Sequence, residues 1–371
     1  MSEPANSLLG EMVFELSKAV RPNILALRGY TCAQRRSTSD LKALLDANEN
    51  AMGPCTLKFA ALNTHRYPDC TASVLRERIA SFRGVSVDRV FVGVGSTEIM
   101  DLLFRTFCSP CSNDHVIIMP PTFEMYAILA QIQEIRVQSI PLTPEFDLDV
   151  QAVTSRIDIH TKIVFVCSPG NPTGKLIPNA VIERLLLQME NGIVVVDEAY
   201  IDFSEAIGAL SLLDKYSNLV ILQTMSKSFG LAGIRLGMAF ASPSLVAILD
   251  AVKLPYNVNR LTIDVASSAF DDLSRFHQNI STIKANRFAL QEQLRELPFV
   301  LRVYHSDANF ILVKMTSADF ICDQMECSPG IAGTTSTAPT AFESPSARKK
   351  RIASSSRLLI MSLIRCTVQH E

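Results

Sequence analysis

Lys227 stands among small hydroxylated residues in the segment Gln223–Gly230, directly after the apolar run Val220–Leu222. Arg235 follows it by eight residues. Ser226 can donate a hydrogen bond to a phosphate oxygen, Arg235 can bind a phosphate with two parallel hydrogen bonds, and Lys227 can form an imine with an aldehyde. This spacing indicates a site for a phosphorylated aldehyde, although a solvated lysine in a polar loop is the plain alternative.

An acidic residue, Asp197, ends the apolar run Ile193–Val196. A buried carboxylate is costly unless a cation or hydrogen-bond donors meet it. A protonated pyridine nitrogen would supply such a cation, whereas a helix cap or an ion pair with an arginine is the alternative. Tyr200, three residues further on, can reach a phenolic oxygen of the same ring or can simply pack in the core.

Two loops rich in glycine complete the candidate site. Cys167–Gly174 contains two prolines and two glycines around Asn171, whose side-chain amide can donate a directed hydrogen bond. Gly93–Thr97 opens a helix-length stretch, where free N–H groups and the helix dipole favour a phosphate, and Ser96 or Thr97 is placed to cap the first turn. Each loop alone is most often only a turn.

The elements that must position these residues follow from the apolar pattern. Short apolar runs alternate with helix-length stretches, which predicts an α/β fold with a mostly parallel sheet covered by helices on both faces. The loops described above would then lie at the carboxyl ends of the strands, where such sheets bind ligands. The predicted strands are Val90–Val94, Val116–Met119, Ile163–Val166, Ile193–Val196, Val220–Leu222 and Gly237–Ala241.

The C-terminal third has a different pattern of apolar and polar residues. Ser281–Leu294 predicts an amphipathic helix and Phe310–Lys314 an alternating strand, which together indicate a smaller α+β domain. In Cys327–Ser356, 21 of 30 residues are Ser, Thr, Pro, Ala or Gly, so a loop or a disordered segment is expected there.

Composition excludes several classes of function. The chain has 371 residues, 48% of them hydrophobic, and 35 basic side chains against 37 acidic ones, so no strong field favours nucleic acid or anionic lipid. It lacks an apolar run long enough to span a membrane, and its start lacks the layout of a signal peptide. We therefore expect a cytoplasmic protein that binds small molecules, with neither nucleic acid nor membrane as a partner.

The cysteines do not indicate a disulfide framework or a metal site. The chain has nine, an odd number that includes Cys108 and Cys167 in apolar stretches, which is typical of reduced, buried thiols. Cys108, Cys111 and His115 have a spacing that could suit zinc, but no fourth ligand follows at matching spacing. We expect no bound metal.

Taken together, an imine-forming lysine, an acid for a pyridinium, donors for a phenolate and a phosphate site form the set that pyridoxal phosphate requires. The chain resembles the fold type I aminotransferases that use this cofactor, and among them the histidinol-phosphate aminotransferase family, over about residues 20 to 315. The motifs that carry the resemblance are Arg21–Leu27, Leu45–Asn50, Arg66–Asp69, Pro120–Tyr126, Pro255–Asn259 and Ser306–Phe310.

The resemblance implies a fold, an assembly and a reaction. It implies a large domain with a mostly parallel central sheet, the PLP-transferase fold type I, plus a smaller α+β domain, in a homodimer. The implied segments are 1–60 joining the small domain and the substrate pocket, 61–265 binding the cofactor, 266–326 forming the small domain, and 327–371 as an atypical tail. The implied reaction exchanges an amino group between L-histidinol phosphate and 2-oxoglutarate, in histidine biosynthesis, with pyridoxal 5'-phosphate as cofactor.

The resemblance also implies roles for individual residues. Lys227 would form the imine and carry protons, Asp197 would hold the ring nitrogen protonated, and Phe123 would stack on the ring. Asn171 and Tyr200 would bond its phenolic oxygen. Contacts to the cofactor phosphate would come from Ser96, Thr97, Ser226 and Arg235, and from Tyr67 of the neighbouring subunit. Tyr30 and Asn50 would line the substrate pocket, although these two residues and Tyr67 can equally serve in packing.

The sequence departs from the family pattern mainly near its C-terminus. Gly333 and Thr334 stand where relatives carry a substrate-binding arginine, and Arg365 lies in a segment that resembles the second arginine motif. Val94, Thr97 and Phe123 replace other residues near the cofactor, changes that backbone N–H groups and a phenyl ring can tolerate. Two alternatives therefore stay open: another fold type I aminotransferase or decarboxylase, and a catalytically impaired chain that still binds the cofactor.

Overall fold

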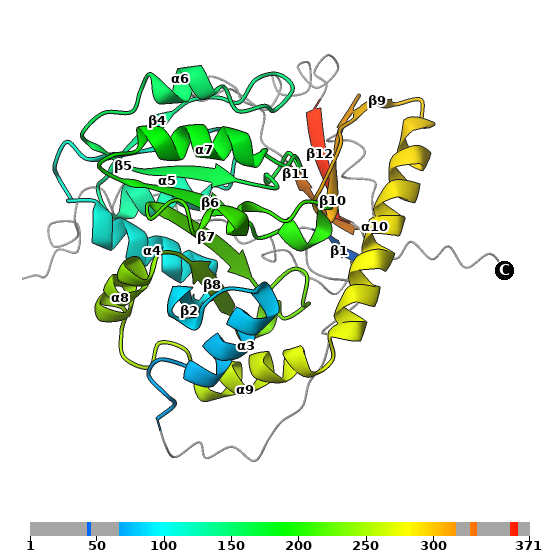
Figure 1. Cartoon of the computed structure of the whole chain (residues 1–371). Helices are drawn as coiled ribbons and strands as arrows, with labels where there is room; N and C mark the ends of the chain where they lie inside the picture. Colours follow the sequence, from blue (N-terminus) through cyan, green and yellow to red (C-terminus); the bar gives the residue numbers. More distant parts are fainter. Residues whose placement is uncertain (1–42, 46–66, 317–326, 332–356, 363–371) are drawn as a thin grey trace, which may run out of the picture.

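Two β-sheets of unequal size and one long helix between them organise the computed structural model, which describes residues 43–45, 67–316, 327–331 and 357–362 (Figure 1). The helices are α3 (Ser73–Arg83), α4 (Gly95–Phe107), α5 (Met125–Ile132), α6 (Val150–Thr154), α7 (Asn179–Gln188), α8 (Pro243–Val252), α9 (Arg260–Ser268) and α10 (Leu273–Arg295). None of the helices in the described residues combines the length and the apolar character that crossing a membrane requires.

The large sheet has seven strands in the order β2-β8-β7-β6-β5-β3-β4. All six predicted strands are present in it, and β8 alone runs antiparallel to its neighbours. The remaining strand, β4, was not predicted, because it is short, polar and only partly buried at the sheet edge. The strands are β2 (Val90–Val94), β3 (His115–Ile118), β4 (Arg136–Ser139), β5 (Thr161–Cys167), β6 (Ile193–Asp197), β7 (Leu219–Thr224) and β8 (Leu236–Phe240).

Helices cover both faces of the large sheet, which explains why its central strands are apolar at every position. In β6, Ile193 and Val195 belong to the apolar cluster that contains side chains of α4, α5 and α8, whereas Val194 and Val196 belong to the cluster that contains side chains of α3, α7 and α10. All five residues of β6 are buried. A strand buried on both faces has no solvent side, so the usual alternation of apolar and polar residues disappears.

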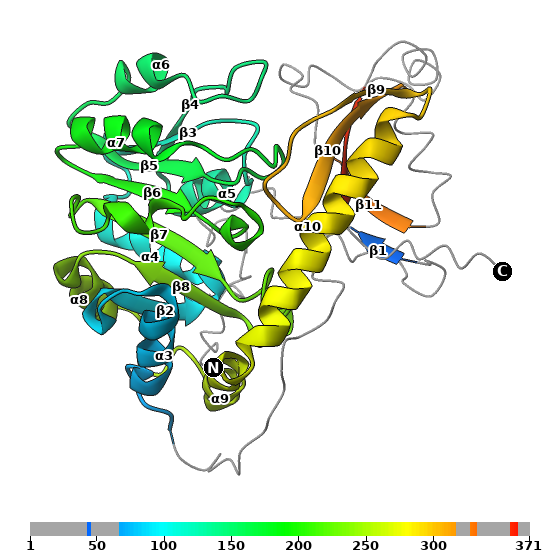
Figure 2. The ribbon, with the colours of Figure 1, turned by 45° about the vertical axis from the view of Figure 1, so that its right-hand side comes forward.

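The helix α10 connects the large sheet to the small one (Figure 2). The guanidinium of Arg287 in α10 donates hydrogen bonds to the carbonyl oxygens of Phe203 (3.2 Å) and Ala308 (2.6 Å). Phe203 follows β6 of the large sheet and Ala308 precedes β10 of the small sheet, so one side chain joins the two parts. The predicted helix Ser281–Leu294 is therefore confirmed as the C-terminal part of a longer helix.

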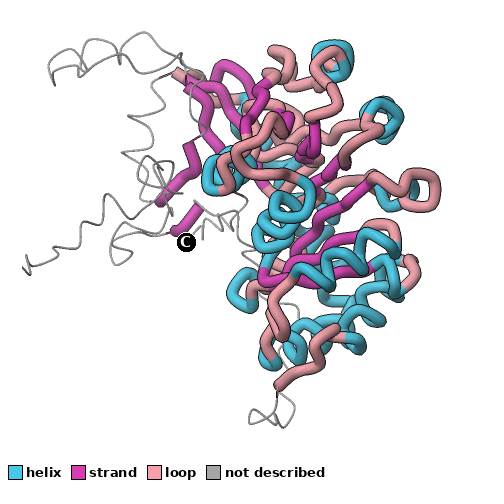
Figure 3. Tube along the Cα trace, turned by 90° about the vertical axis from the view of Figure 1, so that its left-hand side faces the viewer, coloured by secondary structure: helices cyan, strands magenta, loops and turns pink. Residues whose placement is uncertain are grey.

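The small sheet has the order β1-β11-β12-β10-β9 and lies apart from the large one (Figure 3). Its strands are β1 (Ala43–Leu45), β9 (Val300–Val303), β10 (Phe310–Met315), β11 (Cys327–Ile331) and β12 (Arg357–Ser362). The predicted strand Phe310–Lys314 is present, but its first four residues are all buried instead of alternating. The reason is its central place, since it pairs with β9 on one side and with β12 on the other.

The segment Cys327–Ser356 is not a loop throughout. Cys327–Ile331 forms β11, which pairs in parallel with β1 and antiparallel with β12. Composition missed this strand, because pairing through backbone groups does not require apolar side chains. Residues 332–356 lie outside the described residues, and the division of the whole chain into four segments stays a prediction.

Candidate active site

The predicted site residues lie where neighbouring parallel strands of the large sheet end. Asp197 is the last residue of β6, Asn171 lies in the turn after β5, and Lys227 follows β7. Since β5 pairs in parallel with β6, and β6 with β7, their carboxyl ends meet at the same edge of the sheet. The sheet therefore brings together three residues that are far apart in the sequence.

The carboxylate of Asp197 is buried and is held by neutral donors. The Tyr126 hydroxyl donates to Oδ2 at 2.7 Å, and the backbone N–H of Ala199 donates to Oδ1 at 3.2 Å. Burial raises the pKa of Asp197 above its usual range, even though these two donors and the ammonium of Lys227 oppose the rise. Among the described residues, the carboxylate neither caps a helix nor pairs with an arginine. A cation placed against it would stabilise its charged form.

Lys227, Tyr200 and Asn171 form the second part of the site. The Lys227 ammonium lies 5.6 Å from the centre of the Tyr200 ring, which is the range of a cation–π contact. The Asn171 amide donates to the Tyr200 hydroxyl at 3.4 Å. The edge-to-face packing of Tyr200 against Phe310, with ring centres 5.1 Å apart, holds the Tyr200 ring from the side of the small sheet. Two polar groups are therefore fixed beside the amine.

The amino end of α4 makes a close-fitting cradle. A Cβ on Gly95 would lie 2.8 Å from Arg235 Nη2, so the guanidinium sits against the first residue of the helix. A Cβ on Gly237 would lie 2.2 Å from the backbone nitrogen of Ser96, so β8 and the helix can approach only because Gly237 lacks a side chain. First-turn N–H groups next to a guanidinium are a site for a phosphate.

The prediction that Ser96 or Thr97 caps this helix is wrong. The helix begins at Gly95, so Ser96 and Thr97 are inside its first turn, and the N-cap residue Val94 has no side-chain cap. Instead, Glu98 accepts a hydrogen bond from the backbone N–H of Val94 at 2.5 Å. Gly95, with φ of 74° at the end of the strand, allowed the chain to turn into the helix at least two residues earlier than the side-chain pattern indicated.

Ser226 and Arg235 flank the cradle from the loop between β7 and β8. The Ser226 hydroxyl is buried and accepts a hydrogen bond from the Thr224 hydroxyl at 2.9 Å. Arg235 is exposed and has a left-handed backbone with φ of 56°, and its guanidinium donates to the carbonyl oxygen of Ala232 at 3.1 Å. This unusual backbone conformation turns the chain back into β8, which runs antiparallel to β7.

Phe123 lies close to Asp197 in the core, whereas Tyr67 lies at the surface of the chain. Phe123 is half-buried and packs edge-to-face on Tyr126, with ring centres 5.7 Å apart, so it lies one ring away from Asp197. Tyr67 is 80% exposed and stacks on Tyr256, with ring centres 4.6 Å apart. The three predicted substrate residues Tyr30, Asn50 and Arg365 lie outside the described residues.

Two buried polar residues near Asp197 were not assigned a role from the sequence. Tyr126 belongs to a motif that carries the family resemblance, yet its partner Asp197 is 71 residues away. Glu198 follows Asp197, and burial raises its pKa to about 7. The only local signal for Tyr126 is that a buried tyrosine usually finds a hydrogen-bond partner.

The cysteine and histidine residues with zinc-like spacing have separate partners. Cys108 is buried, and burial raises the pKa of its thiol to about 12. Cys111 donates to Glu134 at 3.1 Å, and the His115 ring bonds the Thr161 hydroxyl at 2.9 Å. Within the described part of the chain, no group of three or more His, Cys, Asp or Glu residues could hold a metal ion.

Comparison with known proteins identifies the family. The model of the family "aminotransferase class I and II" matches residues 33–348. The chain belongs to this family. It is accordingly an aminotransferase that depends on pyridoxal phosphate.

Relatives of this aminotransferase match over most of their length. A histidinol-phosphate aminotransferase of Cytophaga hutchinsonii is 41% identical over 314 residues, which cover 85% of this chain and 88% of that protein. One from Saccharomyces cerevisiae is 40% identical over 330 residues, covering 83% and 85%. The solved structure of the Sinorhizobium meliloti histidinol-phosphate aminotransferase in complex with pyridoxal-5'-phosphate has a TM-score of 0.74 at 18% identity, covering 96% of this chain and 95% of that chain. This likeness confirms the predicted fold.

The residues present in this aminotransferase fit the cofactor. The buried Asp197 carboxylate suits a cationic ring nitrogen, and the Lys227 amine suits an aldehyde. The cradle at Gly95 and Gly237 leaves the backbone N–H of Ser96 close to the Arg235 guanidinium, as a phosphate requires.

Proposed function

We propose that the chain transfers the amino group of L-histidinol phosphate to 2-oxoglutarate, giving imidazole-acetol phosphate and L-glutamate in histidine biosynthesis. The observation that carries the chemistry is the buried Asp197 carboxylate, held by neutral donors, beside the Lys227 amine. The substrate is supported by the relatives named histidinol-phosphate aminotransferase, which are about 40% identical over more than four-fifths of this chain.

The cofactor supplies an electrophilic aldehyde and a pyridine ring that withdraws electrons from the substrate Cα. Asp197 binds the ring nitrogen and keeps its proton in place, because a buried carboxylate gains most from a cation at contact distance. Asn171 and Tyr200 donate hydrogen bonds to the phenolic oxygen, since their polar groups already lie together, 3.4 Å apart. Phe123 would pack on the face of the ring.

Lys227 is the general base and acid at the substrate Cα. Its amine would hold the aldehyde before substrate enters, and once the substrate amine had displaced it, the freed amine would move a proton between the substrate Cα and the aldehyde carbon of the cofactor. The Tyr200 ring, 5.6 Å from the ammonium, limits where the flexible side chain can point. One base in one place thereby serves both steps of the proton transfer.

The amino end of α4 would hold the phosphate of the cofactor. Ser96 and Thr97 contribute from the first helical turn, and Ser226 and Arg235 contribute from the loop before β8. Tyr67 would reach the same phosphate in the neighbouring subunit, because its ring is 80% exposed at the surface of its own chain. This contact makes the active enzyme a homodimer with sites at the interface.

The substrate end of the site and the location in the cell belong to the same proposal. Tyr30 and Asn50 would line the pocket for histidinol phosphate, as the family resemblance implies, and Arg365 is the candidate for binding the substrate phosphate. A cytoplasmic location is supported by the reduced thiols of Cys108 and Cys167 and by the biosynthetic relatives.

A catalytically impaired chain is the second candidate, favoured by Gly333 and Thr334 where relatives carry an arginine. The two candidates share the cofactor site and differ in turnover. Loss of one charged contact to a dianionic substrate would raise KM before it abolished the chemistry.

The test uses purified full-length protein loaded with pyridoxal phosphate. We expect a visible absorbance band, borohydride trapping of the cofactor on Lys227, and bleaching of the band in a single turnover with histidinol phosphate. Lys227→Ala should lose the trapping and the turnover. Lys162→Ala, which changes a lysine at the opposite end of β5, is the matched control. Trapping on another lysine contradicts the site, and a band that forms but does not respond to histidinol phosphate favours the impaired chain.

A further inference from the structure

The Tyr126 hydroxyl is the closer of the two donors that hold the Asp197 carboxylate, at 2.7 Å compared with 3.2 Å for the backbone N–H of Ala199. Both side chains are buried, Tyr126 completely. We propose that Tyr126 is a positioning residue, which fixes the orientation and the charge of Asp197 toward the ring nitrogen of the cofactor. This inference rests on the role of Asp197 in the proposed function.

Packing holds the Tyr126 ring in one orientation. The ring stacks on Phe165 of β5, with centres 4.5 Å apart and planes inclined by 9°, and Phe123 packs on it edge-to-face. Stacked and edge-to-face aromatic pairs fix a ring in place as well as burying it. The hydroxyl therefore cannot swing away from Asp197 without opening the core beneath the site.

A neutral donor has a different effect from a cationic one at this place. A lysine or arginine would neutralise Asp197 and compete with the ring nitrogen for its charge, whereas a phenol donates a hydrogen bond and leaves the charge in place. Burial and the charge of Asp197 raise the pKa of Tyr126 well above its usual range, so the phenol keeps its proton and stays the donor. The Cys167 thiol, which also contacts this hydroxyl, is neutral as well, because burial raises its pKa to about 12.

Removing the Tyr126 hydroxyl should alter the protonation of the cofactor's ring nitrogen as well as the rate of the reaction. In Tyr126→Phe, Asp197 loses a donor and becomes more basic, so it takes a larger share of the proton between itself and the ring nitrogen. We expect the nitrogen-15 signal of ring-labelled pyridoxal phosphate to move toward the value of unprotonated pyridine. We also expect kcat to fall about tenfold with little change in KM, the scale of one hydrogen bond to a charged group.

Tyr216→Phe is the matched control. Tyr216 is also buried, and its hydroxyl also donates to a carboxylate, that of Glu183 at 3.2 Å. Neither the nitrogen-15 signal nor kcat should change in this variant. A double variant of Tyr126→Phe and Asp197→Asn should match Asp197→Asn alone, because Tyr126 acts through Asp197.

The outcomes separate this inference from the function on which it rests. A moved signal in Asp197→Asn with an unmoved signal in Tyr126→Phe overturns the positioning role alone. An unmoved signal in Asp197→Asn shows that Asp197 does not face the ring nitrogen, and both proposals then fail. If Tyr126→Phe does not fold, a fluorotyrosine at position 126 strengthens the donor and should move the signal the opposite way, and an unmoved signal would again reject the role.

Discussion

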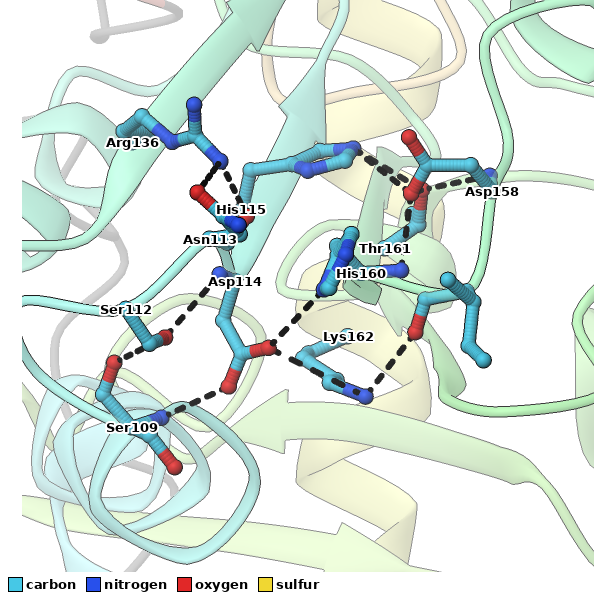
Figure 4. A network of polar contacts seen from close by, with 11 residues as sticks. Ser109, Ser112, Asn113, Asp114, His115, Arg136, Asp158, His160, Thr161 and Lys162 are labelled. Carbon is cyan, nitrogen blue, oxygen red and sulfur yellow. Dashed lines mark hydrogen bonds and ion pairs between the residues drawn. The ribbon is translucent and has the colours of Figure 1, made fainter.

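Two buried aspartates at opposite ends of the large sheet have opposite surroundings. Asp114 precedes β3 at the amino end, where its carboxylate accepts a hydrogen bond from the Ser109 N–H at 2.9 Å and lies 3.9 Å from both Lys162 and His160 (Figure 4). Asp197 ends β6 at the carboxyl end, where a phenol and a backbone N–H hold it.

The difference between the two carboxylates separates a structural site from a functional one. The charge of Asp114 is balanced by a side-chain cation close by, and its side chain is 12% exposed to solvent. The Asp197 carboxylate is buried more deeply, and burial raises its pKa. The phenol and the backbone N–H that hold it are neutral, so its charge stays available to a ligand. A carboxylate that the protein holds without neutralising is therefore the better indicator of a binding site.

The largest expected effect comes from replacing Asp114 and Asp197, each in turn, with asparagine. Asp197→Asn should lower kcat by roughly 10² to 10³, because an oriented charge at the reacting ring is lost, while the cofactor stays bound. Asp114→Asn should keep kcat and lower the free energy of unfolding by about 1 kcal/mol, measured by urea denaturation. A similar loss of kcat in both variants would break the comparison.

Glu198 sharpens the comparison, because it is a third buried acid and is held by the backbone N–H of Ala209 at 2.5 Å and the amide of Gln223 at 2.9 Å. Its pKa is about 7 in the folded protein and 4.5 when unperturbed. Between these values the folded chain binds a proton that the unfolded chain has lost, so stability should fall as pH rises from 4.5 to 7, by about 3 kcal/mol from this group.

Glu198→Gln should remove that pH dependence. The side chain of Gln223 can rotate so that its unpartnered Oε1 accepts from the new amide, which keeps the fold intact. Urea denaturation at pH 5 and pH 8 measures the effect, with Glu183→Gln at the surface as control. An unchanged difference between the two pH values in Glu198→Gln would contradict the assignment.

The smallest expected effect concerns two glycines near the phosphate cradle. Gly237→Ala would place a Cβ 2.2 Å from the Ser96 nitrogen, so the strand and the helix must separate, whereas Gly233→Ala meets no heavy atom within 4 Å. The dissociation constant for pyridoxal phosphate should rise roughly tenfold, about 1.4 kcal/mol, in the first variant only. Equal affinity in the two variants, measured by fluorescence titration, would place the phosphate elsewhere.

The sequence by itself determined six of the seven strands of the large sheet and the places of Lys227, Asp197 and Asn171 at strand ends. A strand buried on both faces must be apolar throughout, and a polar residue that ends such a run is easy to recognise. The resemblance to aminotransferases added the cofactor, and the comparisons confirmed it. The strands and the polar residues at their ends can be predicted from the sequence, because each depends on residues that are close together in the chain.

The tertiary structure alone decided which distant groups meet. The contact of Tyr126 with Asp197, the antiparallel direction of β8 and the pairing of β11 with β1 depend on strand order and register. The burial that raises the pKa of Glu198 depends on them too. The local pattern of apolar residues predicts which residues are buried. It does not predict which side chains they contact, because those contacts depend on the order and register of the strands in the whole sheet.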